Sequence, residues 1–371
     1  WGSISAGGDN LLTPATKVKG YKGFAANGFS LGSLGGYVQY DFSTNPIQDL
    51  PSNPYGVDFV VYGNAFNGNP EAAAVQVYAQ EVRADGTLGE YKWYELAGSM
   101  YYSGSAVRNA TVSYTLASNG AITAKVNDTV HSQNPFVTNA AWFPTKSGMS
   151  HEATSGINNA LTNTYITEYT ANTLKFAGIT SIPDSDSNAD YAFGYADVTP
   201  VPSVKDGTPV NPYTPYTSDK DGGDGFDLAW AVELGSMKPV KINNAKYVRI
   251  YSAVLYNTGI FGETSPEITG IFRAVGTTGS APSESTLPTI KNGLVTVPHS
   301  AMNVTEINAS GKESVSLKFT STAANIYVNG TAITSGESVS FAITAGASKY
   351  VQVITQNENE SPYITVLKLI G

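Results

Sequence analysis

The sequence predicts an all-β protein made of antiparallel sandwiches. Short stretches that alternate apolar and polar residues recur along the chain, and Asn-Gly or Asp-Gly dipeptides separate several of them. No amphipathic helical stretch recurs between these strands, which disfavours a parallel α/β sheet. Hydrophobic residues make up 41% of the 371 residues, enough for sizeable cores, while only 14% are charged, which suits sheets with many turns.

The first part of the chain is expected to form short strands joined by tight turns. Asn67-Gly68, Asp85-Gly86 and Asn119-Gly120 supply the positive φ angles that such turns need. Residues 128–182 fit neither the strand nor the helix period, so we expect a long insertion with a short helix around residues 156–161. The expected strands cover residues 37–42, 57–62, 73–82, 92–96, 111–116, 226–234, 246–254 and 267–275.

A second, smaller sandwich is expected at the C-terminal end. Residues 276–288 are rich in Gly, Ser and Pro and are interpreted as a linker, which gives domains over residues 1–275 and 289–371. Strand candidates recur there at the short spacing of a sandwich. They cover residues 314–320, 325–328, 338–343, 350–355 and 363–370.

The net charge of −9 is concentrated in one stretch. Residues 286–371 hold five Lys and five Glu with no Asp or Arg, whereas residues 184–233 hold nine Asp and one Glu against two Lys. An acidic chain lacks the basic face that binding to a nucleic-acid backbone requires, so no nucleic-acid partner is expected. Crowded carboxylates repel one another unless they are solvated in surface loops or share a cation, and hard oxygen donors suit Ca²⁺.

The later part of this acidic stretch combines carboxylates with glycines. Asp219, Asp221 and Asp224 lie in Ser-Asp-Lys-Asp-Gly-Gly-Asp-Gly, where glycines allow the tight folding that points oxygen atoms inward. The spacing is not that of an EF-hand loop. Residues 226–234 then alternate with period two, so Trp230 is expected in the core and Asp227 on the opposite face of a strand.

Several catalytic chemistries are disfavoured by the residues present. The chain has no Cys, which excludes disulfides and thiolate metal sites. His151-Glu152 begins like a zincin helix but lacks the second His, and no Gly-x-Ser-x-Gly or Walker motif occurs. A glycosidase needs only two carboxylates, so Glu95, Glu263 and Glu267 stay open as members of such a pair.

The chain is expected to be extracellular. It has no run of 18 apolar residues, so no transmembrane helix is predicted. It begins at Trp1 without a signal sequence, and we interpret it as an exported protein whose signal has been removed. Few charges and abundant Tyr, Thr and Asn are typical of bacterial surface proteins.

A set of segments along the first 275 residues resembles one family. They cover residues 31–42, 55–66, 93–99, 193–198, 222–229, 247–251 and 261–268. In this order they resemble bacterial cell-surface proteins with a galactose-binding-like jelly-roll domain. The C-terminal part is similar to the cadherin-like or immunoglobulin-like sandwiches appended to such proteins. The resemblance therefore implies a large jelly roll followed by a smaller immunoglobulin-like sandwich.

The resemblance also implies a binding role without catalysis, often with a structural calcium. The Gly-Gly-Asp-x-Phe-Asp-Leu motif carries calcium binding onto Asp224 and Asp227. The other segments add Asn64 and Glu263 as further oxygen donors. These four residues are the predicted metal ligands.

Aromatic residues are the expected ligand contacts. Sugars offer apolar C–H faces that stack on Trp and Tyr, while their hydroxyls bond Asn, Asp and Gln. Trp142 lies in the irregular insertion, the pair Tyr101 and Tyr102 follows a Gly-Ser turn, and Tyr191 and Tyr195 lie in the acidic stretch. Core packing is the competing interpretation for each of these rings.

Two hypotheses of function follow from these observations. The first is a cell-surface protein that recognises a glycan or other polar ligand through a calcium-stabilised jelly roll. The second is a structural adhesin or spacer without a small ligand. Glycoside hydrolysis is a third and weaker interpretation, because it rests on carboxylates alone.

Overall fold

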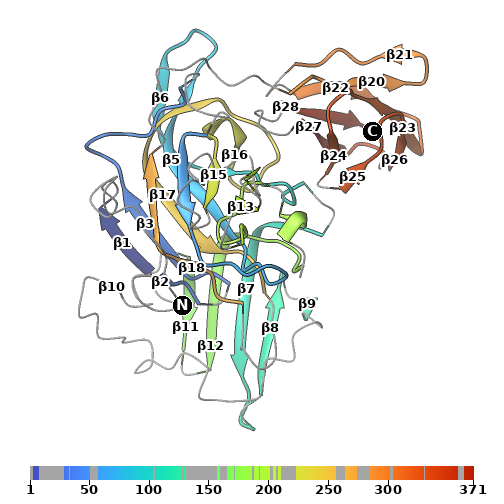
Figure 1. Ribbon diagram of the computed structural model, residues 1–371. Helices are drawn as coiled ribbons and strands as arrows, with labels where there is room; N and C mark the ends of the chain where they lie inside the picture. Colours follow the sequence, from blue (N-terminus) through green and yellow to red (C-terminus); the bar gives the residue numbers. More distant parts are fainter. Residues whose placement is uncertain are drawn as a thin grey trace.

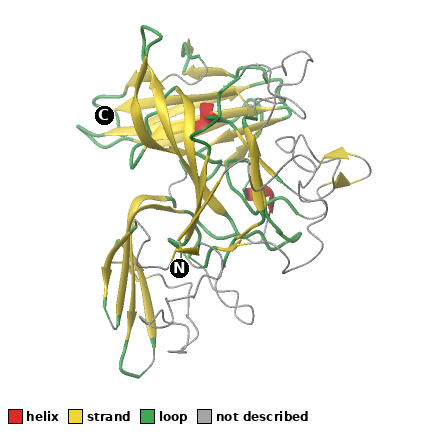
Figure 2. Cartoon of the chain, turned by 90° about the vertical axis from the view of Figure 1, so that its left-hand side faces the viewer, coloured by secondary structure: helices red, strands yellow, loops and turns green. Residues whose placement is uncertain are grey.

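The computed structural model of the chain is all-β (Figure 1). Apart from two three-residue 3-10 helices, η4 (Asn188–Asp190) and η6 (Leu228–Trp230), the regular elements of the described residues are strands (Figure 2). The predicted fold class is thereby confirmed. The structure describes residues 3–7, 29–32, 34–50, 57–102, 105–119, 121–127, 129–130, 157–158, 165–170, 172–185, 188–191, 193–200, 204–205, 208–209, 223–255, 264–273, 285–300, 304–329, 331–357 and 363–371.

Two large sheets dominate the N-terminal part, by which we mean the described residues 3–273. The seven-stranded sheet has the order β10 (Ile157–Asn158), β1 (Ser3–Gly7), β3 (Tyr37–Asp41), β17 (Ile242–Ser252), β5 (Ala73–Val82), β6 (Leu88–Leu96) and β16 (Ala231–Glu233). The five-stranded sheet has the order β11 (Ile166–Tyr169), β12 (Thr173–Ser181), β7 (Val107–Leu116), β8 (Ile122–Val126) and β9 (Thr129–Val130). All neighbours are antiparallel except β1 and β3, which are parallel.

Three smaller sheets complete this part. A three-stranded sheet has the order β15 (Asp224–Phe226), β4 (Phe59–Tyr62) and β19 (Gly270–Arg273). The two-stranded sheets pair β18 (Glu267–Ile268) with β2 (Phe29–Ser30), and β13 (Val204–Lys205) with β14 (Thr208–Pro209).

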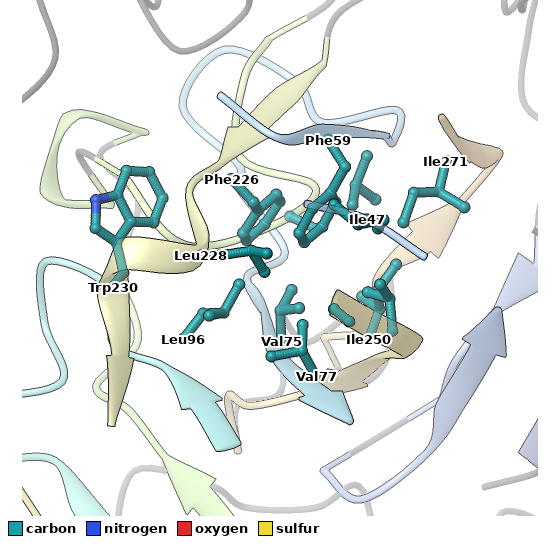
Figure 3. Close-up of a cluster of buried hydrophobic side chains, with 14 of the residues drawn as sticks. Ile47, Phe59, Val75, Val77, Leu96, Phe226, Leu228, Trp230, Ile250 and Ile271 are labelled. Atoms are coloured by element: carbon teal, nitrogen blue, oxygen red, sulfur yellow. The ribbon is translucent and has the colours of Figure 1, made fainter. Parts of the chain in front are cut away.

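The main core lies between the seven-stranded and the three-stranded sheets. Figure 3 shows Val75 and Val77 of β5 facing the same cluster as Phe59 of β4 and Phe226 of β15. The Phe59 and Phe226 rings stack with centroids 5.1 Å apart, because the two residues are paired across the strands. Burying each such ring contributes about 2 kcal/mol. This core holds one face of the seven-stranded sheet inside the protein.

The five-stranded sheet covers one end of the opposite face. Ala74 and Tyr251 from the seven-stranded sheet belong to a second buried cluster with Val112 of β7 and Leu174 and Phe176 of β12. Period-two alternation explains this double burial, since neighbouring residues of β5 point to opposite faces. Only part of this second face is covered in that way.

Most expected strands form within two residues of their predicted ends. The expected strand over residues 267–275 is instead divided into β18 and β19, which belong to different sheets, and residues 226–234 do not form one strand either. The chain leaves β15 at Phe226, turns through η6 and then enters β16. Asp227 causes the break, because its side chain accepts a hydrogen bond from the Ala229 N–H and so caps the 3-10 turn. Trp230 is buried, as predicted, although not as part of a continuous strand.

The predicted insertion over residues 128–182 is also partly wrong. It contains β12, a nine-residue strand that pairs with β7 in the five-stranded sheet. Bulges between Ala177 and Ile179 and between Ile179 and Ser181 interrupt its register, which explains why no clean alternation marks it in the sequence. Ile157 and Asn158 form β10, within the segment predicted as a helix, and the rest of that segment lies outside the described residues.

The C-terminal part, residues 285–371, contains two facing sheets around its own core. One has the order β21 (Val295–Thr296), β20 (Thr289–Asn292), β23 (Ser314–Thr320) and β26 (Ser338–Ala342). The other has the order β22 (Val304–Asn308), β28 (Tyr363–Ile370), β27 (Ser348–Gln356), β24 (Asn325–Val328) and β25 (Thr331–Ile333). β23 alternates strictly between exposed and buried residues, as the sequence predicted for a strand with one face in a core.

The outer face of the second of these sheets packs against the N-terminal part. Val366 of β28 shares a buried cluster with Val232 of β16 and with Tyr101 and Tyr102. The described strands form no sheet that mixes the two parts, so their contact is made by side chains. The predicted domain boundaries and the linker stay predictions, because residues 274–284 lie outside the described residues.

The described residues contain no helix with the length and apolar character needed to cross a membrane.

Candidate functional site

The uncovered part of the opposite sheet face carries a cluster of aromatic rings. We call Tyr78, Tyr91, Trp93 and Tyr247 the aromatic face. Each belongs to a strand of the seven-stranded sheet whose alternate residues fill the main core. Since side chains alternate in direction along a strand, these rings point away from that core. All four are partly exposed.

Strand register brings the four rings into contact. Tyr78 of β5 lies directly opposite Trp93 of β6 on one side and Tyr247 of β17 on the other. Its ring centroid is 5.4 Å from that of Trp93, 5.7 Å from that of Tyr247 and 5.5 Å from that of Tyr91. These separations are within the range of favourable aromatic pairs. The result is a preformed aromatic surface across three strands.

Two cations lie over this surface. The Lys246 Nζ atom is 4.0 Å from the ring centroid of Tyr91, and the Arg249 guanidinium carbon is 3.9 Å from that of Trp93. The same guanidinium carbon lies 4.8 Å from the Tyr37 ring centroid. All three distances suit cation–π attraction, which holds the charges beside the rings.

A row of polar side chains runs beside the rings and into the protein. Arg249 donates from Nε and Nη2 to Gln39 Oε1, at 3.3 Å and 2.9 Å. Tyr165 donates its hydroxyl to Gln76 Oε1 at 2.8 Å, and Gln76 Nε2 donates to Glu95 Oε2 at 2.9 Å. Hydrogen bonds therefore link residues near the aromatic face to a buried carboxyl group.

Glu95 ends this row in a closed environment. Burial raises its pKa to about 7, against the lowering effect of hydrogen bonds from the Tyr251 hydroxyl and Gln76. Its side chain is buried, and its partner Tyr251 belongs to the second buried cluster, which the five-stranded sheet covers. Glu95 supports the sheet face from inside and is not exposed to a ligand.

A separate cluster of carboxylates lies near the three-stranded sheet. Oxygen atoms of Glu71, Asp197 and Glu267 all lie within 4.8 Å of one another. Asp197 Oδ1 accepts the Asn64 N–H at 2.6 Å, and Oδ2 accepts the Glu267 N–H at 2.9 Å. Asp197 adopts a positive φ of 61°, which turns its side chain back into this loop. Three chain segments thus bring three acidic groups to one point.

Close approach of the chain requires a glycine here. A Cβ atom on Gly63 would lie 2.2 Å from Asp197 Oδ1 and 2.8 Å from Asp197 Cα. No side chain can occupy that space while Asp197 keeps its position. A glycine at position 63 is therefore needed for Asp197 to keep its place in the cluster.

Mutual repulsion and burial disfavour three ionised groups in this cluster. Burial first, and then the charges of Glu267 and Asp197, raise the pKa of Glu71 to about 9. The pKa of Asp197 is also raised, by burial first. Bound protons or a bound cation would relieve this repulsion. Its carboxylate oxygens are the ligand type that Ca²⁺ prefers, so these residues could in principle hold that ion.

Two of the four predicted metal ligands lie around this cluster. Asn64 contributes its backbone N–H to Asp197. Asp224 lies close enough for its charge to raise the Asp197 pKa, but its own oxygens accept from Val198 N–H and from the Thr199 N–H and hydroxyl. Burial raises the Asp224 pKa to about 7. Metal binding by these residues stays a prediction.

The other two predicted ligands, Asp227 and Glu263, are not found in this cluster among the described residues. Asp227 groups with Asp49 and Asp58, whose carboxylate oxygens lie within 4.8 Å of one another and of Asp227. Asp58 Oδ2 accepts the Leu228 N–H at 2.8 Å, so this group also braces the start of η6. Glu263 lies outside the described residues.

The aromatic residues predicted as ligand contacts are buried where they are described. Tyr101 is 2% exposed, and its hydroxyl donates to the Ser236 carbonyl oxygen at 2.7 Å. Tyr102 packs in the same cluster with Val366, while Tyr191 and Tyr195 pack edge to face with centroids 5.6 Å apart. These contacts give all four a packing role, and ligand contact by them stays a prediction. Trp142 lies outside the described residues.

Sequence reasoning missed both the aromatic face and most of the carboxylate cluster. The signal for most of the face was present, because Tyr78, Trp93 and Tyr247 alternate with core residues in the expected strands, whereas Tyr91 lies just before the expected strand over residues 92–96. Glu71 had no such signal, since it stands alone before an apolar strand. No protein-family model and no curated protein matches this chain.

Proposed function

We propose that this protein is a bacterial cell-surface protein that binds a glycan on the aromatic face. The observation that carries the proposal is the row of partly exposed rings, Trp93, Tyr78 and Tyr247, held in contact by strand register. Sugar rings present apolar C–H surfaces that stack on such side chains. Rigid strands also spare the site the entropy cost of ordering on binding.

Polar groups around the rings support the same proposal. Gln80 and Asn244 lie beside the aromatic face and form a hydrogen bond at 3.4 Å, and Gln39 and Asp41 border it on β3. Amide and carboxylate groups of this kind bind sugar hydroxyls. A flat aromatic surface with a polar border fits an oligosaccharide better than a fully apolar ligand.

Calcium is proposed as a structural ion at the cluster of Glu71, Asp197 and Glu267. The cation would neutralise acidic groups that burial and mutual repulsion otherwise force to hold protons. The positive φ of Asp197 and the space beside Gly63 suit a preformed loop. In this proposal calcium fixes the loops next to the sheet and takes no part in ligand binding.

The proposed fold assignment is a galactose-binding-like jelly roll followed by an immunoglobulin-like or cadherin-like sandwich. Paired antiparallel sheets around separate cores support it. We infer a location at the cell surface from the resemblance to bacterial surface proteins. We propose a binding role without catalysis, because the buried carboxyl of Glu95 and the cluster containing Glu267 occupy separate sites.

A spacer function is the competing proposal, supported by the buried contact between the two parts, which would stiffen a stalk. Glycan binding separates the two. The wild-type protein and the Trp93→Ala and Tyr247→Ala variants are applied to an array of neutral and acidic oligosaccharides, and hits are measured by calorimetry. Each substitution should weaken binding about tenfold, because one stacking contact is lost.

Phe66→Ala is the matched control, since Phe66 is an exposed aromatic residue that is not part of the aromatic face. It should leave binding unchanged. If no oligosaccharide binds the wild-type protein, the spacer proposal is favoured. If Trp93→Ala binds a hit as tightly as the wild type, the ligand site lies elsewhere.

A further inference from the structure

The aromatic face carries a local positive charge on an acidic protein. The whole chain has a net charge of −9, yet the two charged groups placed directly over the rings, Lys246 and Arg249, are both cations. Neither forms a salt bridge within the part of the chain that the structure describes.

Arg249 is nearly buried and has only neutral acceptors. It is 7% exposed, its guanidinium donates two hydrogen bonds to Gln39 Oε1, and its guanidinium carbon lies 5.2 Å from the Tyr165 ring centroid. A guanidinium group has five N–H donors, and the two bonds to Gln39 do not use all of them. A buried charge with unused donors is costly unless an opposite charge reaches it.

The nearby carboxylates do not supply that charge. The Asp41 side chain bonds within its own loop, where Oδ1 accepts the Ser43 N–H at 2.7 Å. Glu95 is held at the far side of Gln76 by hydrogen bonds from Gln76 and Tyr251. Among the described residues, the two cations therefore lack a counter-charge, and the rings beside them are partly exposed.

We propose that the aromatic face binds a glycan that carries carboxylate groups, with Arg249 and Lys246 recognising the carboxylate while a sugar ring stacks on Trp93 or Tyr247. This inference rests on the proposed glycan-binding function and names its ligand class. A planar carboxylate matches the forked donors of a guanidinium group. Lys246 adds attraction for a second acidic unit along the chain of a polyuronate.

The test compares one glycan backbone with and without its charge. The probes are trigalacturonate and its fully methyl-esterified form, measured by calorimetry against the wild-type protein. The acid should bind about tenfold tighter than the ester, because only the acid offers charge-assisted hydrogen bonds. Raising the salt concentration should narrow this difference.

Variants then locate the preference. Arg249→Gln should lower the affinity for the acid to that of the ester, and Lys246→Gln should lower the affinity for the acid about threefold. Neither variant should change the affinity for the ester. Lys246 is partly exposed, so its variant keeps the test valid if Arg249→Gln fails to fold. Lys92→Gln is the control, because Lys92 is exposed on β6 and points to the other side of the sheet from Trp93.

Five outcomes would overturn the inference. Equal binding of acid and ester overturns the inference, as does a preference for the acid that both variants retain. If neutral oligosaccharides bind in a Trp93-dependent way without any preference for acidic ones, the inference fails while the proposed function stands. If no oligosaccharide of either kind binds, both fail together. Tighter binding of a sulfated oligosaccharide than of trigalacturonate would also overturn the choice of carboxylate.

Discussion

Replacing Glu71 by Gln tests whether its cluster holds a cation. Glutamine has the shape of a protonated glutamate and cannot ionise, so the Glu71→Gln variant mimics one protonated member of the cluster. Metal-free wild-type protein should lose stability as the pH rises, because the folded carboxyl keeps its proton up to a pKa of about 9 while the unfolded one has its ordinary pKa of 4.5. The variant should lack this part of the pH dependence.

The expected magnitude follows from the shift. Stability from a raised carboxyl pKa is fully present below pH 4.5 and is lost as the pH rises toward 9. Each pH unit in this window corresponds to about 1.4 kcal/mol, so wild-type protein loses about 4 kcal/mol from this group between pH 5 and pH 8. For a part of this size the loss corresponds to a fall in Tm of about 8–16 °C.

The assay is thermal unfolding at pH 5 and pH 8, with chelator and with excess calcium. At pH 8 without metal, Glu71→Gln should be more stable than the wild type. Calcium should raise the wild-type Tm at pH 8 and have a much smaller effect on the variant, which has lost a charged ligand. Glu90→Gln, at an exposed position of β6, is the control and should follow the wild type.

Two results would refute this reasoning. If metal-free Glu71→Gln were no more stable than wild type at pH 8, the cluster would not destabilise the folded protein through Glu71. If calcium raised the Tm of both proteins equally, the cation would bind elsewhere, with the group of Asp49, Asp58 and Asp227 as the next candidate.

Two further predictions address the loop and the contact between the two parts. Gly63→Ala should destabilise the protein by about 1–3 kcal/mol and remove the calcium-dependent rise in Tm, because the added Cβ would displace Asp197. Gly89→Ala is the control and should do neither, since the nearest atom to its added Cβ would be 3.5 Å away. An unchanged calcium response of Gly63→Ala would contradict this prediction. Val366→Asp should separate the two parts without unfolding either, since Val366 faces the interface and is not part of the C-terminal core. Small-angle scattering should show a larger radius of gyration, with Leu294→Asp, at a 99% exposed position, as the control; an unchanged radius would mean that this contact does not hold the parts together.

The sequence was sufficient where a pattern is local. Strands such as β5, β23 and β28 form at their predicted residues because each alternates or runs apolar between recognisable turns. The same reasoning placed Trp230 in a core. It failed at residues 226–234, where a single side-chain cap at Asp227 converts one expected strand into two short strands and a turn. A capping hydrogen bond competes with the ladder and leaves no mark on the period.

The candidate sites depended on contacts between distant segments. Sequence reasoning placed the acidic stretch and named Asp224, but the cluster next to it joins Glu71, Asp197 and Glu267, which are far apart in the chain. Tyr101 and Tyr102 looked available for a ligand because they lie outside any alternation, and the C-terminal part then covers them. Whether an aromatic ring is covered depends on which other surface packs on it, which its neighbours in sequence do not encode.

The sequence by itself determined an all-β chain, an acidic first part with a neutral last part, and the strands whose alternation is regular. Only the tertiary structure decided which side chains meet: it aligned Tyr78 with Trp93 and Tyr247, placed Arg249 beside them and gathered three carboxylates from three segments. The physical reason is that alternation fixes the face on which a side chain lies, whereas strand order and register fix its neighbours.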